Sequence, residues 1–145
     1  MNGYTEGFST IELIMVIVIA GISMAIALPK FTAVTDVDLY STARQVKSDI
    51  RYTQELAMSK YAIRKIEFDG NDSTYDIKDS SGVTLESKEL PARSKAIFSA
   101  GSTLVFTFNA TGEPITGGGG TLTISSGGSN EQIVVSSITG KANIL

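Results

Sequence analysis

The apolar positions of this chain fall into three zones, and the first is an almost unbroken run near the N-terminus. Residues 13–29 carry no charge, and Ser23 is their only polar side chain. Counted from Phe8, the run to Pro29 is 22 residues, which gives a helix of about 33 Å at about 1.5 Å per residue. The hydrocarbon core of a bilayer is about 30 Å thick. The pattern predicts a transmembrane helix over residues 8–29, with a kink near Pro29 because proline removes a backbone hydrogen bond.

The second zone, residues 30–61, has the 3.6-residue periodicity of an amphipathic helix, with Asp36 or Asp38 placed to cap its N-terminus. One stripe of apolar or small residues recurs at spacings of three and four, and we expect it to face the sheets of the domain. The stripe consists of Leu39, Ala43, Val46, Ile50, Thr53 and Ala57.

Three basic residues, Arg44, Lys47 and Arg51, follow one another at single-turn spacing on another face of this helix. Asp49 and Glu55 are interleaved with them in the sequence. We interpret this face as a solvated surface.

The third zone, residues 62–145, changes to the alternation typical of β-strands. The clearest strand is 103–109, in which Leu104, Phe106 and Phe108 share one face. Turn residues divide the zone into about seven short strands, with turns at 70–72, 80–82, 111–114, 117–120, 126–129 and 139–140. One long helix followed by antiparallel strands predicts an α+β fold, with the helix packed on a C-terminal sheet or sandwich.

Glu12 is the one acid at the edge of the apolar run. A carboxylate at membrane depth costs roughly 2.5–3.5 kcal/mol on insertion scales and usually marks function. One interpretation is a simple membrane anchor with Glu12 in the headgroup zone. A second is a cleaved signal peptide, with residues 25–27 as a small-x-small cleavage site and a secreted soluble binding domain as the product. Residues 1–7 contain no Lys or Arg, and the apolar run exceeds the usual length of a signal-peptide core.

A third interpretation rests on the hexapeptide Gly-Phe-Ser-Thr-Ile-Glu at residues 7–12, followed by the apolar run and Pro29. This segment resembles the prepilin cleavage and methylation motif of type IV pilins and type II secretion pseudopilins. The resemblance implies that a prepilin peptidase cuts between Gly7 and Phe8 and methylates the new amine of Phe8. The chain then divides into a leader (1–7), the assembly helix (8–29), the amphipathic helix (30–61) and an antiparallel β domain (62–145).

The chemistry of the new N-terminus agrees with this assignment. An α-amine has an ordinary pKa of about 7.7–8.0, so Phe8 would be cationic near neutral pH. An ammonium and a carboxylate that are buried together offset costs that either would incur alone. The resemblance implies that Glu12 of an incoming subunit pairs with Phe8 of a subunit already in the filament and so sets the axial register. The implied partners are the prepilin peptidase and other pilin or pseudopilin subunits.

All Lys and Arg residues lie at or beyond Lys30, so the positive-inside rule alone would place the C-terminus in the cytoplasm. Large C-terminal domains, however, translocate largely regardless of charge. The resemblance implies a single-pass protein of the bacterial inner membrane whose C-terminal domain lies in the periplasm and later in the pseudopilus or pilus.

The composition narrows the chemistry further. The chain has no Cys and no His, which excludes disulfides, Ser–His and Cys–His nucleophiles and the usual zinc sites. The loop at 69–73 fails the spacing of a calcium-binding EF-hand, which needs Gly at Thr74 and Glu at Ser80. The chain has 12 basic and 15 acidic residues. A DNA-binding stretch near the C-terminus would carry several basic residues, whereas residues 140–143 contain Lys141 alone. We therefore expect no enzyme, no cofactor, no metal and no nucleic-acid partner.

The layout of one long helix before many short strands resembles the GspH/FimT group of minor pseudopilins and minor pilins. The matching segments are Phe-Thr-Phe-Asn at 106–109, Thr-Gly-Glu-Pro at 111–114 and the closing strand after 139–141. The favoured function is a minor pseudopilin of a type II secretion system, assembled into a periplasmic pseudopilus. The alternative is a FimT-like minor pilin of a type IV pilus, active in assembly, adhesion or DNA uptake.

Overall fold

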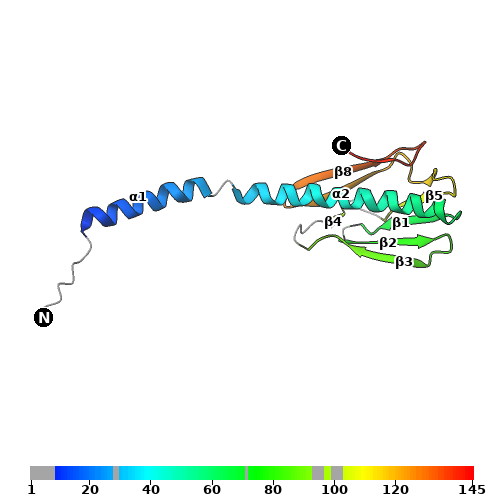
Figure 1. Cartoon of the computed structure of the whole chain (residues 1–145), viewed down its shortest axis with the longest axis horizontal. Coiled ribbons are helices and arrows are strands. Elements are labelled where there is room, and N and C mark those ends of the chain that lie inside the picture. Colours follow the sequence, from blue (N-terminus) through cyan, green and yellow to red (C-terminus); the bar gives the residue numbers. More distant parts are fainter. Residues whose placement is uncertain (1–8, 28–29, 71, 93–96, 99–102) are drawn as a thin grey trace. The chain divides into compact units, whose positions relative to one another are not determined.

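The computed structural model describes residues 9–27, 30–70, 72–92, 97–98 and 103–145, with backbone alone for 25–27 and 30–37. The chain forms two compact units, residues 1–34 and 35–145. Helix α1 is Thr10–Ala27 and helix α2 is Lys30–Ser59 (Figure 1). Pro29 and the kink expected there lie outside the described residues.

Helix α2 begins earlier than its predicted caps. Asp36 and Asp38 lie inside the helix, so the expectation that either residue caps it is wrong. No Gly or Pro interrupts residues 30–59, and without a breaker the helix continues through both acids. The backbone carbonyl of Asp38 accepts hydrogen bonds from the hydroxyls of Ser41 and Thr42, both at 2.8 Å.

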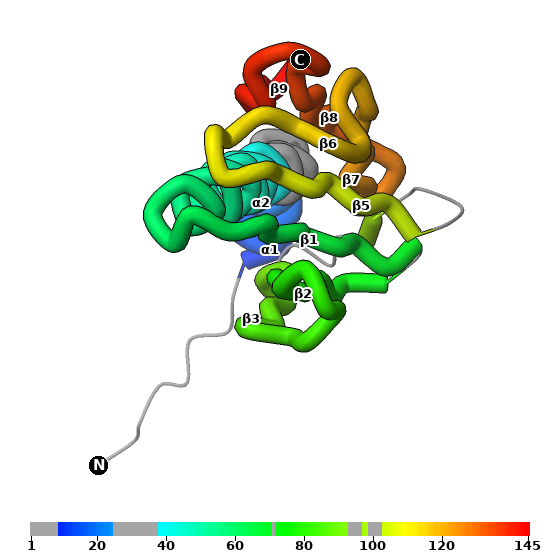
Figure 2. The backbone as a smooth tube through the Cα atoms, turned by 90° about the vertical axis from the view of Figure 1, so that its right-hand side faces the viewer, coloured from blue at the N-terminus to red at the C-terminus, as the bar shows by residue number. Residues whose placement is uncertain are grey.

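The described residues form nine strands in two antiparallel sheets. The five-stranded sheet has the order β3-β2-β1-β5-β6, with β1 Arg64–Phe68, β2 Thr74–Asp79, β3 Thr84–Glu89, β5 Leu104–Phe108 and β6 Pro114–Thr116. The four-stranded sheet has the order β4-β7-β8-β9, with β4 Ile97–Phe98, β7 Thr121–Ser126, β8 Ser129–Val135 and β9 Ala142–Ile144. Figure 2 shows the strands of both sheets curving around one side of α2. The predicted α+β class is confirmed.

The predicted strand pattern differs from the structure at two places. Strand β6 lies between two expected turns, where Thr116 pairs with Thr107 of β5. Strand β8 begins at Ser129 because only Gly127 and Gly128 form the turn before it, with φ of 58° and 92°. Glycine adopts such left-handed conformations without the steric cost that a Cβ would add.

The core of the second unit lies between α2 and the two sheets. Every residue of the predicted helix stripe is buried, from Leu39 at 2% exposed to Ala57 at 0%, so this prediction is confirmed. The sheets contribute alternate positions, as in Ile66 and Phe68 of β1. Phe68 forms ring contacts with Tyr75, Phe98 and Phe106, with centroids 5.3, 4.9 and 6.1 Å away.

A polar contact ties α2 to the edge of the five-stranded sheet. The Asp49 carboxylate accepts a hydrogen bond from the Tyr75 hydroxyl at 2.6 Å and pairs with the Lys88 ammonium at 2.6 Å. Burial raises the pKa of Tyr75 well above its usual range, and the hydrogen bond to Asp49 adds to the shift. Asp49 is only 13% exposed at its side chain, so it does not belong to the solvated face where the sequence placed it.

A second polar contact anchors two loops to α2. The Gln54 side-chain amide donates to the carbonyls of Gly112 and Thr139 at 2.6 and 2.8 Å. The first of these loops is organised by Asn109, whose side-chain carbonyl accepts from the backbone N–H of Thr111 and of Glu113. Hydrogen bonds from Asn109 and then Thr111 hold the pKa of the Glu113 carboxyl below its usual range. The segments 109–113 and 139–140 therefore meet at one helical residue.

Removal of the Asp49 carboxylate tests the first contact. Asp49→Ala leaves the Lys88 ammonium and the Tyr75 hydroxyl without their partner, and we expect the free energy of unfolding to fall by about 2–3 kcal/mol. Urea unfolding of the full chain in detergent, followed by far-UV circular dichroism, measures it. Glu55→Ala, at an exposed position of the same helix, is the control and should change stability by less than about 0.5 kcal/mol. Equal losses in the two variants would contradict a specific role for Asp49.

Two glycines with positive φ provide a matched test of the loop contact. A Cβ at Gly140 would lie 2.9 Å from Gln54 Nε2, 2.9 Å from Phe108 Cε1 and 3.0 Å from the Gly112 carbonyl, whereas a Cβ at Gly127 meets nothing within 4 Å. Both alanine variants incur the backbone cost of about 1 kcal/mol, and Gly140→Ala adds about 1–3 kcal/mol for the clash. The same urea titration should give Gly140→Ala the lower midpoint. Coincident midpoints would show that the 139–140 loop shifts freely and that Gln54 does not fix it.

Candidate assembly site

The N-terminal end of α1 places Glu12 in its first turn. The backbone carbonyl of Ser9 accepts hydrogen bonds from the N–H groups of Glu12 and Leu13 at 3.0 and 3.2 Å, so Ser9 is the N-cap residue. A negative charge in the first helical turn interacts favourably with the helix dipole, and the Glu12 side chain is exposed. Gly7 and Phe8, the predicted cleavage pair, lie outside the described residues, so their pairing with Glu12 stays a prediction.

The remainder of α1 presents large apolar side chains to its surroundings. Ten of them are between 52% and 68% exposed: Ile11, Leu13, Ile14, Met15, Val16, Ile17, Val18, Ile19, Ile22 and Met24. Their positions cover all sides of the helix rather than one stripe. The one polar group among them, the Ser23 hydroxyl, donates to the Ile19 carbonyl at 2.8 Å and so stays within the helix. A continuous exposed apolar surface of this kind marks a site of association with other apolar groups.

The 18 described residues of α1 correspond to about 27 Å of helix. Of the helices that the structure describes, none combines the length and the apolarity needed to cross a membrane. The predicted span of residues 8–29 includes Phe8, Leu28 and Pro29, which lie outside the described residues. The membrane-spanning role therefore stays a prediction.

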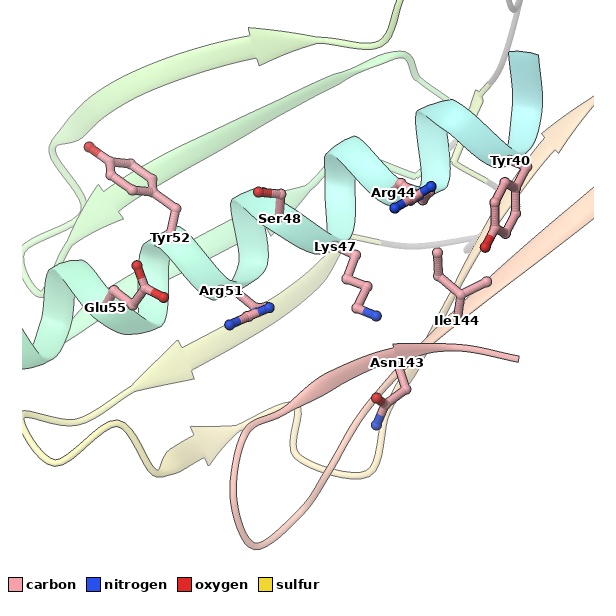
Figure 3. A pocket seen from close by; sticks show the side chains of 9 residues that line it. All are labelled: Tyr40, Arg44, Lys47, Ser48, Arg51, Tyr52, Glu55, Asn143 and Ile144. Atoms are coloured by element: carbon pink, nitrogen blue, oxygen red, sulfur yellow. The ribbon is translucent and has the colours of Figure 1, made fainter. Parts of the chain in front are cut away.

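The exposed face of α2 carries the three basic residues singled out from the sequence. Arg44, Lys47 and Arg51 line a hollow of about 760 Å³ together with Asn143 and Ile144 of β9, among others. Figure 3 shows the Lys47 side chain directed from α2 toward this strand. The sequence predicted a basic helix face. The structure shows that strand β9, about a hundred residues further along the chain, forms the other side of the hollow.

Positive charge dominates the lining of this hollow, which we call the basic groove. Glu55 is the only acidic side chain that lines it, at one end. The Arg44 guanidinium lies 5.9 Å from the centre of the Tyr40 ring, a cation–π distance. Within the described part of the chain, carboxylates pair only with Lys78 and Lys88, so the three groove cations have no ionic partner.

A hollow on the outer face of the five-stranded sheet is lined mainly by acidic residues, although Lys65 also lies on this face, opposite Lys78. Glu67, Asp69 and Asp76 line a shallow hollow of about 150 Å³ with Lys78, among other residues. The Lys78 ammonium lies 3.1 Å from Glu67 and 3.4 Å from Asp76 and bridges the two strands. We call this surface the acidic face. No group of three or more potential metal ligands exists among the residues that the structure describes.

Comparison with known proteins gives a match at the level of the fold. The chain is similar to two crystal structures of the type IV minor pilin FimU from Pseudomonas aeruginosa, in different crystal forms. The first match has a TM-score of 0.58 at 18% identity and covers 74% of this chain and 92% of FimU. The second has a TM-score of 0.60 at 18% identity and covers 76% and 90%.

Sequence comparisons add no closer assignment. No protein-family model matches the chain. No curated protein matches it either. Over the 74–76% of the chain that is covered, the fold is similar to that of FimU, and the chain therefore has a pilin-like α+β fold.

Proposed function

We propose that this chain is a minor subunit of a pilin-like filament, made as a precursor and assembled through α1. The observation that carries the proposal is the surface of α1, where large apolar side chains are exposed on all sides and Glu12 is the only charge. A helix with this surface needs lipid or other helices around it. The pilin-like fold, which is similar to FimU over 74–76% of the chain, supports this proposal.

Processing between Gly7 and Phe8 fits the local structure. Ser9 caps α1, so the cut would leave the amine of Phe8 immediately before the cap. An ammonium at that place faces the positive end of the helix dipole, which is unfavourable. The Glu12 carboxylate, one turn away, compensates this charge. N-methylation of Phe8 keeps the amine cationic while it adds apolar surface.

Assembly then moves α1 from the inner membrane into the centre of the filament. We propose that residues 8–29 hold the subunit in the bilayer, with the domain of residues 35–145 in the periplasm, until neighbouring helices replace the lipid. Glu12 contacts the Phe8 amine of a neighbour and sets the axial position. A misplaced subunit would leave a carboxylate unpaired among apolar helices, which is costly.

Two machines use subunits of this kind. The absence of Cys points away from pilins with a C-terminal disulfide and, with the strand-rich domain, fits both a minor pseudopilin and a simple minor pilin. Of these two, the sequence interpretation favours a minor pseudopilin of type II secretion. The similarity to FimU, which is a type IV minor pilin, favours a minor pilin of a type IV pilus as the second candidate. Neighbouring genes separate them: a secretin and secretion ATPase with other pseudopilins support the first, and pilus retraction genes support the second.

Intact-mass measurement of the mature protein tests the processing step. The chain is expressed in a bacterium with an active prepilin peptidase, and its N-terminal peptide is sequenced by tandem mass spectrometry. We expect a mature N-terminus at Phe8 that carries one added methyl group. A mature N-terminus at Leu28 would instead identify a signal peptide and a secreted binding domain, and would remove the pilin interpretation.

Replacement of Glu12 tests the assembly step separately. Glu12→Ala removes the carboxylate from the first turn of α1 but leaves Gly7 and Phe8 in place. We expect normal cleavage together with at least a tenfold loss of the subunit from sheared filaments, equivalent to about 1.4 kcal/mol or more per contact. Quantitative immunoblots of filament and membrane fractions measure both steps. Thr10→Ala, in the same turn, is the control, and incorporation of the Glu12→Ala subunit at the control level would refute the register role.

A further inference from the structure

The basic groove has a charge that nothing in the described chain neutralises. Arg44, Lys47 and Arg51 have no carboxylate partner there, and Glu55 stands at one end of the groove. By contrast, Lys88 lies 2.6 Å from Asp49, and Lys78 lies 3.1 Å from Glu67. Among the described residues, Lys78 and Lys88 of the five-stranded sheet therefore have carboxylate partners, whereas the three groove cations of α2 have none.

The acidic face provides a complementary surface on the same domain. Ile66 and Phe68 of β1 are buried in the core. Glu67, between them, therefore belongs to the face of the sheet turned away from the core. Asp76 pairs in register with Glu67 across β1 and β2 and so lies on the same face. Asp69 extends this surface, and Lys78 is the one base within the hollow.

We propose that the basic groove of one copy of this chain receives the acidic face of a second copy. The two surfaces carry opposite charge, with three cations and one acid in the groove against three acids and one cation on the acidic face. Because the two patches differ, the contact is heterologous: the copy that uses its groove keeps its acidic face free, and the copy that uses its acidic face keeps its groove free. Contacts of this type add subunits in one direction without closing on themselves.

This inference rests on the proposed filament function and adds the partner and the surface outside α1. Ion pairs at exposed surfaces are individually weak, and salt screens them over about 10 Å at 0.1 M ionic strength. Such a contact becomes effective when anchored helices hold the domains at high local concentration. Charge complementarity then fixes which faces meet and in what orientation, rather than the strength of association.

A nucleic acid is the competing occupant of a basic groove, and the observations favour the protein partner. The whole chain has a formal net charge of −3, which repels a polyanion at long range. Three cations spaced over two turns, about 10 Å of helix, offer few phosphate contacts. The acidic face, on the other hand, supplies carboxylates on the chain itself.

Disulfide trapping tests the contact, because the natural chain contains no Cys. Ser48→Cys places a thiol in the groove, and Thr103→Cys places one beside the acidic hollow; both positions are exposed. The two full-length variants are purified in detergent, mixed at low salt and oxidised, and non-reducing gels with peptide mapping identify each dimer. We expect the mixed disulfide, which joins a groove thiol to an acidic-face thiol, to exceed either homodimer by about fivefold. It should disappear at 1 M salt, where the screening length is about 3 Å.

Charge reversal identifies the groove as the surface involved. Lys47→Glu in the Ser48→Cys chain should lower the yield of mixed disulfide about fivefold or more, because it replaces attraction with repulsion. Lys60→Glu, at an exposed position just beyond α2, is the control and should leave the yield unchanged. Circular dichroism verifies that each variant is folded.

Three outcomes would overturn the inference: a mixed dimer no more abundant than the roughly twofold excess over either homodimer that random pairing gives, no salt-sensitive disulfide, or retention of a single-stranded DNA oligonucleotide that Lys47→Glu abolishes. The last outcome would assign the groove to a polyanion. Because the assay uses purified chains, its failure would leave cleavage at Gly7 and the role of Glu12 standing. If the Glu12→Ala subunit were incorporated normally but the mixed disulfide formed as expected, the proposed filament role of Glu12 would be refuted and the contact between the two surfaces would stand.

Discussion

Both sheets of the domain depend on the burial of one face of α2. The helix stripe from Leu39 to Ala57 is at most 2% exposed, and residues from both sheets complete the same core. The chain has no Cys, so no disulfide joins the two sheets. Their common packing against α2 holds them together instead. Thr53 is the polar member of this buried stripe. Its hydroxyl donates a hydrogen bond to the Asp49 carbonyl at 2.9 Å, so no polar group of the stripe is buried without a partner.

Around this core the polar groups have distinct tasks. Asp49 and Gln54 point from α2 into contacts with Tyr75, Lys88 and the loop carbonyls. They fix the position of the helix against both sheets. The cations on the exposed side of α2 take no part in these contacts, which leaves them available for recognition. One helix therefore serves as the centre of the core and as a docking surface.

Local patterns in the sequence predicted most of the fold, because they depend on neighbours within a turn or a strand. The spacing of Leu39, Ala43 and Val46 identified the buried face, and the alternation around Phe106 identified β5. The helical segment from residue 30 was predicted, but its cap was misplaced, because a possible capping residue such as Asp38 acts as a cap only where the helix actually begins. Strand β6 was missed because three residues between turn signals carry too short a pattern.

The candidate site was likewise predicted from the sequence only in part. The basic residues of α2 were identified from the sequence. The other side of the groove, at Asn143 of β9, depends on sheet topology, which no local pattern encodes. Asp49 was grouped with the solvated residues because its partners, Tyr75 and Lys88, are 26 and 39 positions away. The cleavage pair Gly7 and Phe8 stays a prediction from the motif alone, since the described residues begin at Ser9.

The turn between β7 and β8 has a practical consequence for following this subunit in cells. At Gly127 and Gly128 a Cβ would meet no atom within 4 Å, and both residues are exposed, so a side chain at either position would extend into open space. Exposed turns of small residues accept inserted segments well. A short epitope or a dye-labelled peptide placed there would report the location of the protein without entering its core, its groove or its N-terminal helix.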